Sequence, residues 1–248
     1  MHGDADCAAL LLAAGQGTRM KSDLAKVLHT VAGKTMIRYV LEAVQAVVPA
    51  RIVMVIGHQA DAVRRELIGE RVEFVVQAER LGTGHAALMA KERFAGFTGT
   101  IVVLNGDTPL LRSSTLARFI AYHRGEGASG SVLSAELDDP VGYGRIVRDE
   151  RGAFLRITEH KDASDDVRSI REINSGIFCF DSADFFGALG KVERRNVQGE
   201  YYITDVMEIL RREGKRVGVW LCDQGEEVLG INTVEQLQAA ERLMRKHG

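Results

Sequence analysis

Short apolar runs and longer amphipathic stretches alternate along the first half of the chain. Continuous apolar runs at Cys7–Ala13, Arg51–Ile56, 72–77 and Thr100–Asn105 predict buried strands. The stretches between them, at 35–47, 59–68, 84–93 and 113–123, carry apolar residues three or four positions apart and predict helices. Apolar strands that alternate with amphipathic helices are typical of a parallel sheet covered on both faces. Ligands of such sheets bind just outside the carboxyl ends of the strands.

The rhythm changes after about residue 128. Strands are predicted at 129–137, 144–147, Phe154–Thr158 and 172–180 with few helices between them, and a strand at 216–221 separates helices at 201–212 and 233–246. We therefore expect an α/β fold with a mixed, mainly parallel sheet flanked by helices and a smaller antiparallel lobe. Because no repeat or low-complexity linker divides the chain, we expect a single domain over 1–248. Its first lobe spans 1–127, its second lobe 128–230 and its C-terminal helix 231–248.

Composition and charge exclude several classes of protein. The net charge of −2 argues against broad binding to nucleic acid. Cys7, Cys179 and Cys222 are widely spaced and form no CxxC pair, which argues against a disulfide framework or a zinc site. Asp4 and Asp6 stand where a signal peptide carries positive charge, and no apolar run approaches the roughly 20 residues of a membrane span. We expect a cytoplasmic protein with neither nucleic-acid nor membrane partners.

The turn after the first predicted strand combines glycines with basic residues. Gly15 and Gly17 permit close backbone approach, and their amides can hold phosphate oxygens. Arg19 and Lys26 add positive charge nearby. The spacing is neither that of a P-loop nor that of the GxGxxG dinucleotide site, because Met20 replaces the third glycine. Taken alone, the turn indicates either a phosphate site or a glycine turn with solvated charges.

The longer string LLAAGQGTRMKSDLAKVLHTVAGKTMI decides between these interpretations. It resembles the signature of sugar-1-phosphate nucleotidylyltransferases, and more narrowly the uridylyltransferase domain of the bacterial bifunctional enzymes that make UDP-N-acetylglucosamine. The similarity continues, in order, through QAERLGTGHA, NGDTPL, DPVGYGRI, EHKDA, EINSG, GEYYITD and GIN, and so spans nearly the whole chain. The resemblance implies a Rossmann-like, nucleotide-diphospho-sugar transferase fold, with the first lobe binding nucleotide and the second binding sugar.

The resemblance also implies a reaction. A magnesium-dependent enzyme would transfer UMP from UTP to N-acetylglucosamine 1-phosphate, releasing pyrophosphate and supplying a cell-wall precursor. Arg19, Lys26 and Asp107 would be catalytic, and Mg²⁺ would be held by Asp107 and Asn232. Carboxylate and amide oxygens suit Mg²⁺, which takes few protein ligands besides substrate phosphates. Asn232 has an alternative interpretation as the N-cap of the last helix.

The same resemblance assigns binding residues. For the nucleotide they are Leu12, Ala13, Ala14, Gly15, Gly17, Thr18, Lys26, Gln77, Gly82, Thr83, Asn105 and Gly106. Gln77 would read the uracil edge, because an amide offers both a donor and an acceptor. For the sugar they are Gly144, Glu159, Asn174, Tyr202, Thr204 and Asn232.

Departures from the family pattern leave alternatives open. Ser175 replaces a common threonine and Asn105 a frequent tyrosine. The bifunctional members carry a C-terminal β-helix acetyltransferase domain that drives trimer formation. Residues 1–248 contain no hexapeptide repeat of that kind, so we expect no acetyltransferase activity in them. We expect a trimer only if the full-length protein has that domain. The alternatives are a transferase of the same fold with another sugar-phosphate or cofactor acceptor, and a non-catalytic sugar-nucleotide sensor. A nicotinamide-dependent oxidoreductase is disfavoured by the missing third glycine.

Overall fold

The apolar runs of the first half form the parallel part of one sheet in the computed structural model, which describes residues 6–47 and 51–247. The strands are β1 (Cys7–Ala13), β4 (Arg51–Ile56), β5 (Glu73–Val76) and β6 (Thr100–Asn105). In the described chain the sheet runs β11-β7-β10-β6-β1-β4-β5, and β1 pairs in parallel with both β4 and β6. The register sets Leu12 opposite Asn105, so the carboxyl ends of β1 and β6 lie side by side.

The second half of the chain supplies the mixed part of the sheet. Its strands are β7 (Gly130–Glu136), β8 (Arg145–Arg148), β9 (Phe154–Thr158), β10 (Glu172–Asp181) and β11 (Val217–Leu221). β10 is antiparallel to both β6 and β7, and β8 and β9 form an antiparallel pair beside it. The predicted α/β class, with a mainly parallel sheet and a smaller antiparallel part, is confirmed.

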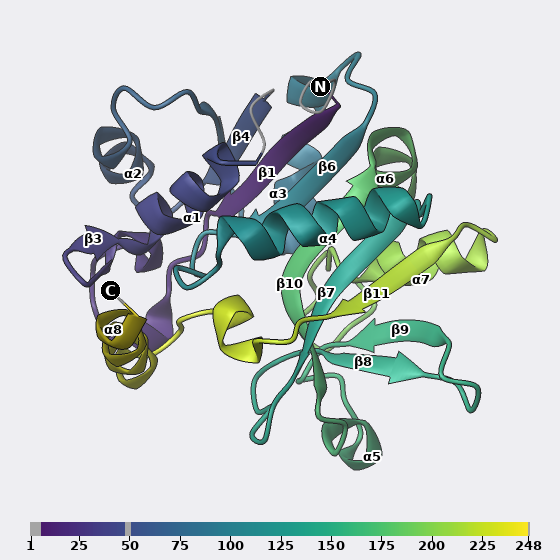
Figure 1. Ribbon diagram of the computed structural model, residues 1–248. Helices are drawn as coiled ribbons and strands as arrows, with labels where there is room; N and C mark the ends of the chain where they lie inside the picture. Colours follow the sequence, from purple (N-terminus) through teal and green to yellow (C-terminus); the bar gives the residue numbers. More distant parts are fainter. Residues whose placement is uncertain (1–5, 48–50, 248) are drawn as a thin grey trace.

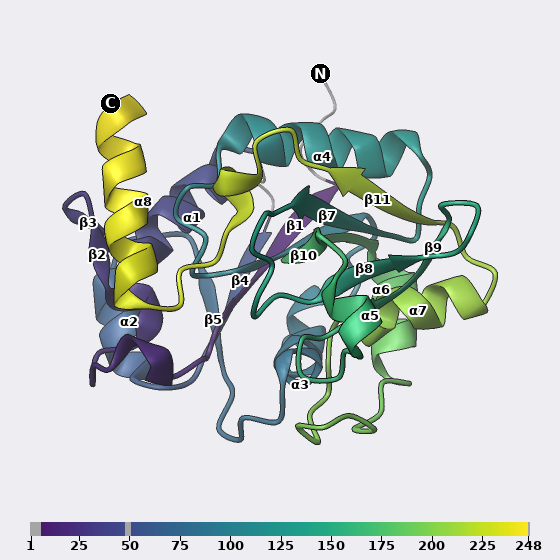
Figure 2. The ribbon, with the colours of Figure 1, turned by 90° about the horizontal axis from the view of Figure 1, so that it is seen from below.

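Successive residues of β1 face opposite sides of the sheet and belong to two apolar clusters. One contains Cys7, Ala9 and Leu11 together with residues of α1 (Met36–Gln45), α2 (Ala60–Glu66) and α4 (Ser113–Gly125). The other contains Ala8 and Leu10 together with residues of α3 (Thr83–Met89), α6 (Ser182–Leu189) and α7 (Asp205–Arg212). Figures 1 and 2 show α4 on one side of the sheet and α6 and α7 on the other. Burial on both faces explains why these strands lack polar alternation.

Several elements differ from the predictions. The short strands β2 (Thr30–Val31) and β3 (Lys34–Thr35), the short helix α5 (Asp165–Arg168) and helix α6 were not predicted. The predicted helix 84–93 divides into α3 and a 3₁₀ helix at Lys91–Phe94. The helix predicted at 201–212 begins only at Asp205, because the backbone of Tyr201 bonds instead to Leu81 and Gly84.

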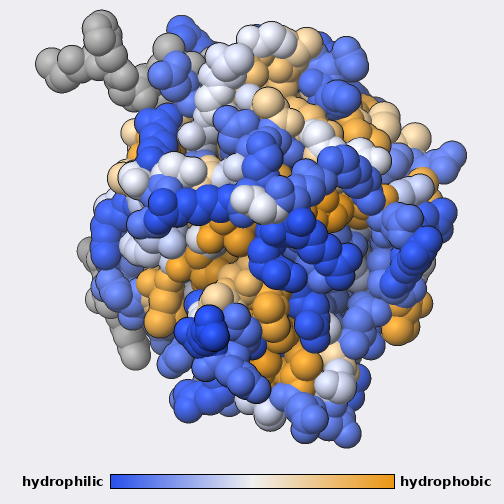
Figure 3. All heavy atoms as spheres, turned by 90° about the vertical axis from the view of Figure 1, so that its right-hand side faces the viewer, coloured by the Kyte–Doolittle hydropathy of each residue, from blue (hydrophilic) through white to orange (hydrophobic). Residues whose placement is uncertain are grey.

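The C-terminal helix α8 (Val234–His247) packs beside β2 (Figure 2). The contact includes a small apolar cluster with Val31, Met36 and Ala240. Within the described residues no helix has the length and apolar character needed to cross a membrane. The face of the molecule in Figure 3 mixes hydrophilic residues with smaller hydrophobic areas.

His123 gives the fold a pH-dependent stability. The ring is buried in α4 and lies 2.9 Å from the Ser131 hydroxyl, and burial lowers the pKa of His123 to about 4. In the unfolded chain His123 is protonated below about pH 6.5, whereas in the folded chain it stays neutral down to about pH 4. The free energy of unfolding therefore falls as the pH drops from 6.5 toward 4.

We predict that this residue removes about 2 kcal/mol of unfolding free energy between pH 7 and pH 5. Denaturant unfolding of the wild type and of His123→Gln at both pH values measures it. The substitution should lower stability at pH 7 but flatten the pH dependence by that amount. An equal pH dependence in both proteins would contradict the prediction.

Candidate functional site

A cleft of about 500 Å³ opens at the carboxyl ends of the parallel strands. It is lined by most of the residues predicted to bind nucleotide, metal and sugar: Leu12, Ala13, Ala14, Gly15, Arg19, Lys26, Gln77, Gly82, Thr83, Asn105, Gly106, Asp107, Gly144, Glu159, Asn174, Thr204 and Asn232. Gly17 and Tyr202 do not line it. The side chain of Thr18 lies outside the described part of the structure.

The glycine turn is shaped by its contact with Lys26. Gly17 has a positive φ of 71°, and a Cβ at this position would lie 2.5 Å from the Lys26 Cβ. Any side chain would therefore push Lys26 away. Although Gly17 does not face the cleft, it allows the turn and Lys26 to lie together. The 3₁₀ helix Thr18–Met20 follows directly and carries Arg19.

Two cations, a carboxylate and an amide meet at the centre of the cleft. Lys26 forms an ion pair with Asp107 and donates to Asn232 Oδ1 at 3.0 Å. Arg19 donates to the same amide oxygen at 2.8 Å. These residues come from the glycine turn, from the segment after it, from the end of β6 and from the residues before α8, so the fold concentrates their charge at one point.

Asn232 is not the cap of the last helix. The backbone N–H of Gln236 donates to Thr233 Oγ1 at 3.2 Å, and the backbone N–H of Thr233 donates to Gln236 Oε1 at 3.2 Å. These two bonds form a capping box. Asn232 Nδ2 donates to Gly230 O at 3.1 Å, and this bond leaves its Oδ1 directed at the two cations. The alternative interpretation of Asn232 as an N-cap is therefore wrong.

The environment of Asp107 suits a small divalent cation. Its Oδ1 is buried without a hydrogen-bond partner among the described residues, and the Asn232 amide oxygen shares the same Lys26 neighbour. No cluster of three or more His, Cys, Asp or Glu residues in the described chain could hold a metal. A metal here would use Asp107 and Asn232 and complete its shell with ligand oxygens, as Mg²⁺ does.

Gln77 lies at one end of the cleft and is only 4% exposed. Its Nε2 donates to Gly82 O at 3.2 Å and lies 2.9 Å from His85 Nδ1. These contacts fix the orientation of the side-chain amide, and among the described residues no hydrogen bond is recorded to its Oε1. Gly82 has a φ of 105°, and a Cβ there would lie 2.5 Å from the Tyr201 carbonyl oxygen, so this loop also requires glycine.

Another part of the cleft wall is built by the second half of the chain. The Thr204 hydroxyl donates to Glu159 Oε1 at 3.2 Å, and the backbone N–H of Asn174 donates to the Gly144 carbonyl at 2.9 Å. A Cβ on Gly144 would approach the Glu159 carboxylate to 3.4 Å, so the absent side chain keeps that carboxylate open to the cleft. Burial raises the pKa of Glu159.

Tyr202 lies behind this end rather than on its wall. The residue is buried. Burial and the nearby carboxylates of Asp162 and Glu159 raise the pKa of Tyr202. Its neighbours Ile203 and Thr204 line the cleft in its place.

Sequence reasoning gave no role to some residues that line the cleft. Tyr143 donates to Gly230 O at 3.3 Å, and burial together with Asp107 raises the pKa of Tyr143 to about 12. Arg80 donates to Gln16 Oε1 at 2.6 Å, across the glycine turn. The motifs around Tyr143 and Arg80 were recognised, but a motif alone does not tell which of its residues face the ligand.

Comparisons with known proteins identify the family of this chain. A family model, the MobA-like NTP transferase domain, matches residues 9–172. The bifunctional protein GlmU of Enterococcus faecalis is 48% identical over 238 residues, and that of Brevibacillus brevis is 50% identical over 238 residues. Each alignment covers 96% of this chain but only 52% and 51% of the relatives, so the chain spans about half the length of the curated relatives it matches.

A solved structure also shares the fold. The crystal structure of a putative glucose-1-phosphate thymidylyltransferase from Bacillus anthracis, in complex with sucrose, superposes with a TM-score of 0.77. The superposition covers 96% of this chain and 95% of that chain at 20% sequence identity. At this identity the similarity supports the fold alone.

Asp205, at the start of α7 behind the Glu159 end of the cleft, gives a testable property. Burial raises the pKa of Asp205 to about 6, and the nearby carboxylates of Glu208 and Asp162 contribute to this shift. The folded chain therefore keeps a proton that the unfolded chain releases near pH 4, and stability falls as the pH rises from 4 through 6.

We predict that Asp205→Asn raises the unfolding free energy by roughly 1–3 kcal/mol at pH 8, because the buried negative charge is removed. The gain should vanish below about pH 4. Thermal unfolding of both proteins across this range measures the difference, and a gain that does not change with pH would refute the assignment.

Proposed function

This chain belongs to the MobA-like NTP transferase domain family, and from that premise we propose that it transfers UMP from UTP to N-acetylglucosamine 1-phosphate. The family match confirms the resemblance and the enzyme class, nucleotidyl transfer, predicted from the sequence. The observation that carries the proposal is the junction of Arg19, Lys26, Asp107 and Asn232 between two chemically different ends of one cleft.

In the proposed reaction an oxygen of the sugar phosphate attacks the α-phosphorus of UTP. A new P–O bond forms, the bond to the β-phosphate bridging oxygen breaks, and pyrophosphate leaves. A phosphate monoester is already an anionic nucleophile, so the protein's task is to align two polyanions and neutralise their charge. Lys26 and Arg19 lie where they can do so, with the glycine-turn amides beside them.

In the proposal Asp107 and Asn232 hold a magnesium ion, which when bound supplies positive charge at the reacting phosphates. The unpartnered, buried Asp107 Oδ1 supports this assignment. Lys26 contacts both residues, so it would lie next to the same phosphates.

The two ends of the cleft support the proposed substrates. With Nε2 held by Gly82 and His85, Gln77 Oε1 can act as the acceptor that uracil N3–H requires, whereas cytosine carries no hydrogen at N3. At the other end, Glu159 and Asn174 offer a carboxylate and an amide, groups that suit sugar hydroxyls and an N-acetyl group. The cell-wall role, a cytoplasmic location and the absence of nucleic-acid or membrane partners stay predictions.

The decisive experiment is pyrophosphate release from UTP plus N-acetylglucosamine 1-phosphate, with and without Mg²⁺. We expect turnover only with Mg²⁺, and little turnover with other nucleoside triphosphates or sugar phosphates. Preference for another acceptor would replace the proposed substrate. Binding of UDP-N-acetylglucosamine without turnover would indicate a sensor instead.

We predict that Asp107→Asn and Arg19→Ala each lower kcat by about 100-fold or more. The first removes the negative charge that would hold the metal ion, and the second removes a positive charge beside the reacting phosphates. Arg118→Ala is the control, since Arg118 forms a surface pair with Asp223. Circular dichroism checks that all variants fold. Near-wild-type turnover of either cleft variant would overturn the mechanism.

Gln77→Ala is predicted to lower kcat/KM for UTP by about 10- to 100-fold, because an N–H of the base loses its acceptor. The preference for UTP over CTP should shrink correspondingly. Gln45→Ala, in a surface network on α1, is the control. An unchanged preference would show that Gln77 does not read the base.

A further inference from the structure

The segment that carries Lys26 into the cleft has little regular structure of its own. Residues 21–25 form neither helix nor strand, and Lys21 has a positive φ of 49°. The amide of Leu24 bonds to the Ser22 hydroxyl. The buried amide of Ala25, directly before Lys26, bonds to a side chain 34 residues away. The position of Lys26 thus depends on a contact from elsewhere in the chain.

That contact comes from Gln59, at the turn between β4 and α2. Gln59 Oε1 accepts from the Ala25 amide at 2.9 Å, and Gln59 Nε2 donates to the Asp23 carbonyl at 2.8 Å. One side-chain amide therefore satisfies a donor and an acceptor of the same segment, as a neighbouring strand would. The preceding residue of the turn, His58, donates its amide to Ala14 O at 3.4 Å, so this turn also contacts the start of the glycine turn.

The backbone at Gln59 is unusual for its residue type. It has φ 53° and ψ 40°, a left-handed conformation that costs free energy in every residue with a Cβ and that glycine adopts most easily. Its side chain makes no capping bond to α2. A strained residue whose side chain serves a different segment indicates a function for that side chain.

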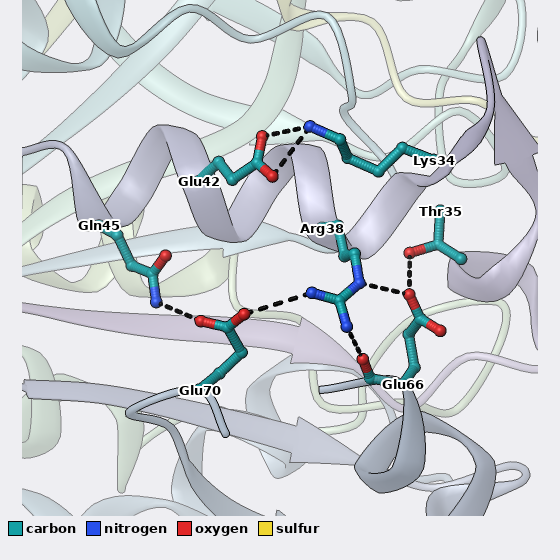
Figure 4. A network of polar contacts seen from close by, with 7 residues as sticks. All are labelled: Lys34, Thr35, Arg38, Glu42, Gln45, Glu66 and Glu70. Atoms are coloured by element: carbon teal, nitrogen blue, oxygen red, sulfur yellow. Dashed lines mark hydrogen bonds and ion pairs between the residues drawn. The ribbon is translucent and has the colours of Figure 1, made fainter. Parts of the chain in front are cut away.

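Helix α2 gives Gln59 a fixed base. Figure 4 shows the far end of α2 joined to α1: Arg38 Nε donates to Glu66 Oε1 at 2.6 Å and Arg38 Nη1 to Glu70 at 3.2 Å. Thr35 also donates to Glu66, at 3.0 Å (Figure 4). The buried Val63 anchors the middle of the helix in the core. Gln59 therefore directly precedes a helix that is anchored at its middle and at its far end.

We propose that Gln59 is a positioning residue that holds Lys26 between Asp107 and Asn232. This inference rests on the proposed function, in which Lys26 neutralises charge at the reacting phosphates. Gln59 does not line the cleft, so it acts only through the backbone of the segment from Asp23 to Ala25.

The test compares Gln59→Gly with a matched control. The substitution removes both side-chain bonds and relieves the left-handed strain. Ala32→Gly relieves comparable strain, since Ala32 has a φ of 48°, but removes no hydrogen-bonding group. Gln59→Asn keeps an amide and tolerates the left-handed conformation, yet is one methylene too short to reach both partners.

We expect Gln59→Gly and Gln59→Asn to lower kcat about tenfold or more, since small misplacements of a catalytic group are costly. The KM for the sugar phosphate should change less than about twofold, because Gln59 lies away from the sugar end of the cleft. The melting temperature should stay within a few degrees of wild type, because strain relief offsets the lost bonds. Ala32→Gly should leave kcat unchanged.

A second readout separates this inference from the proposed function. Acetylation of Lys26 by an amine-selective reagent, followed by peptide mass spectrometry, reports how well its ammonium group is held in the ion pair. Acetylation of Lys26, measured relative to that of the exposed Lys191, should rise several-fold in Gln59→Gly. This rise is expected even if the wild type does not catalyse the proposed transfer of UMP. Unchanged kcat, or unchanged Lys26 labelling, in Gln59→Gly would overturn the positioning role.

Discussion

The ion pair between Lys26 and Asp107 is the interaction on which the site depends. Removing one partner of a partly buried pair leaves an uncompensated charge, so each residue constrains what can stand at the other's position. The pair exists because β1 and β6 are parallel neighbours in register, which brings the glycine turn and the Asp107 turn to one edge. A phosphate that enters the cleft meets cations already held in place, so little reorganisation is needed at the moment of reaction.

The reversed strand β10 gives the proposed site walls from two differently built halves of one sheet. Because β10 runs antiparallel to β6, its first residues lie at the edge where β6 ends. Asn174 reaches the cleft in this way, and the register between β10 and β7 shifts just after it. Gly176, with a φ of 80°, lies in this irregular stretch next to the Asn105 side chain. The parallel half can thus bind a nucleotide, while the antiparallel half adds a second, differently shaped wall.

The sequence predicted the parallel half of the fold well. The bounds of β1, β4 and β6 agree with the predictions, because strands buried on both faces are nearly continuous apolar runs. Prediction failed where distant contacts override local pattern. The segment 201–204 continues the amphipathic pattern of α7, yet its backbone bonds to the loop at 81–84. Helix α6 was missed although Asp181 marks its start, where the carboxylate accepts from the backbone amides of Ala183 and Asp184; the helix is short and follows β10 directly.

The same limit applies to the site. Residues that face the cleft lie in recognisable motifs, because ligand chemistry restricts which residue types can stand there. Residues that hold them are harder to recognise: Gln59 lies outside the motifs, and His85 lies inside one that does not reveal its contact with the Gln77 amide. Thr233 is the exception, because its spacing from Gln236 is that of a capping box. Gln59 bonds to a backbone amide and a backbone carbonyl, which are atoms that every segment presents whatever its sequence. Their roles follow only once the chain is folded, so variation at such positions can change catalysis while every recognised motif stays intact.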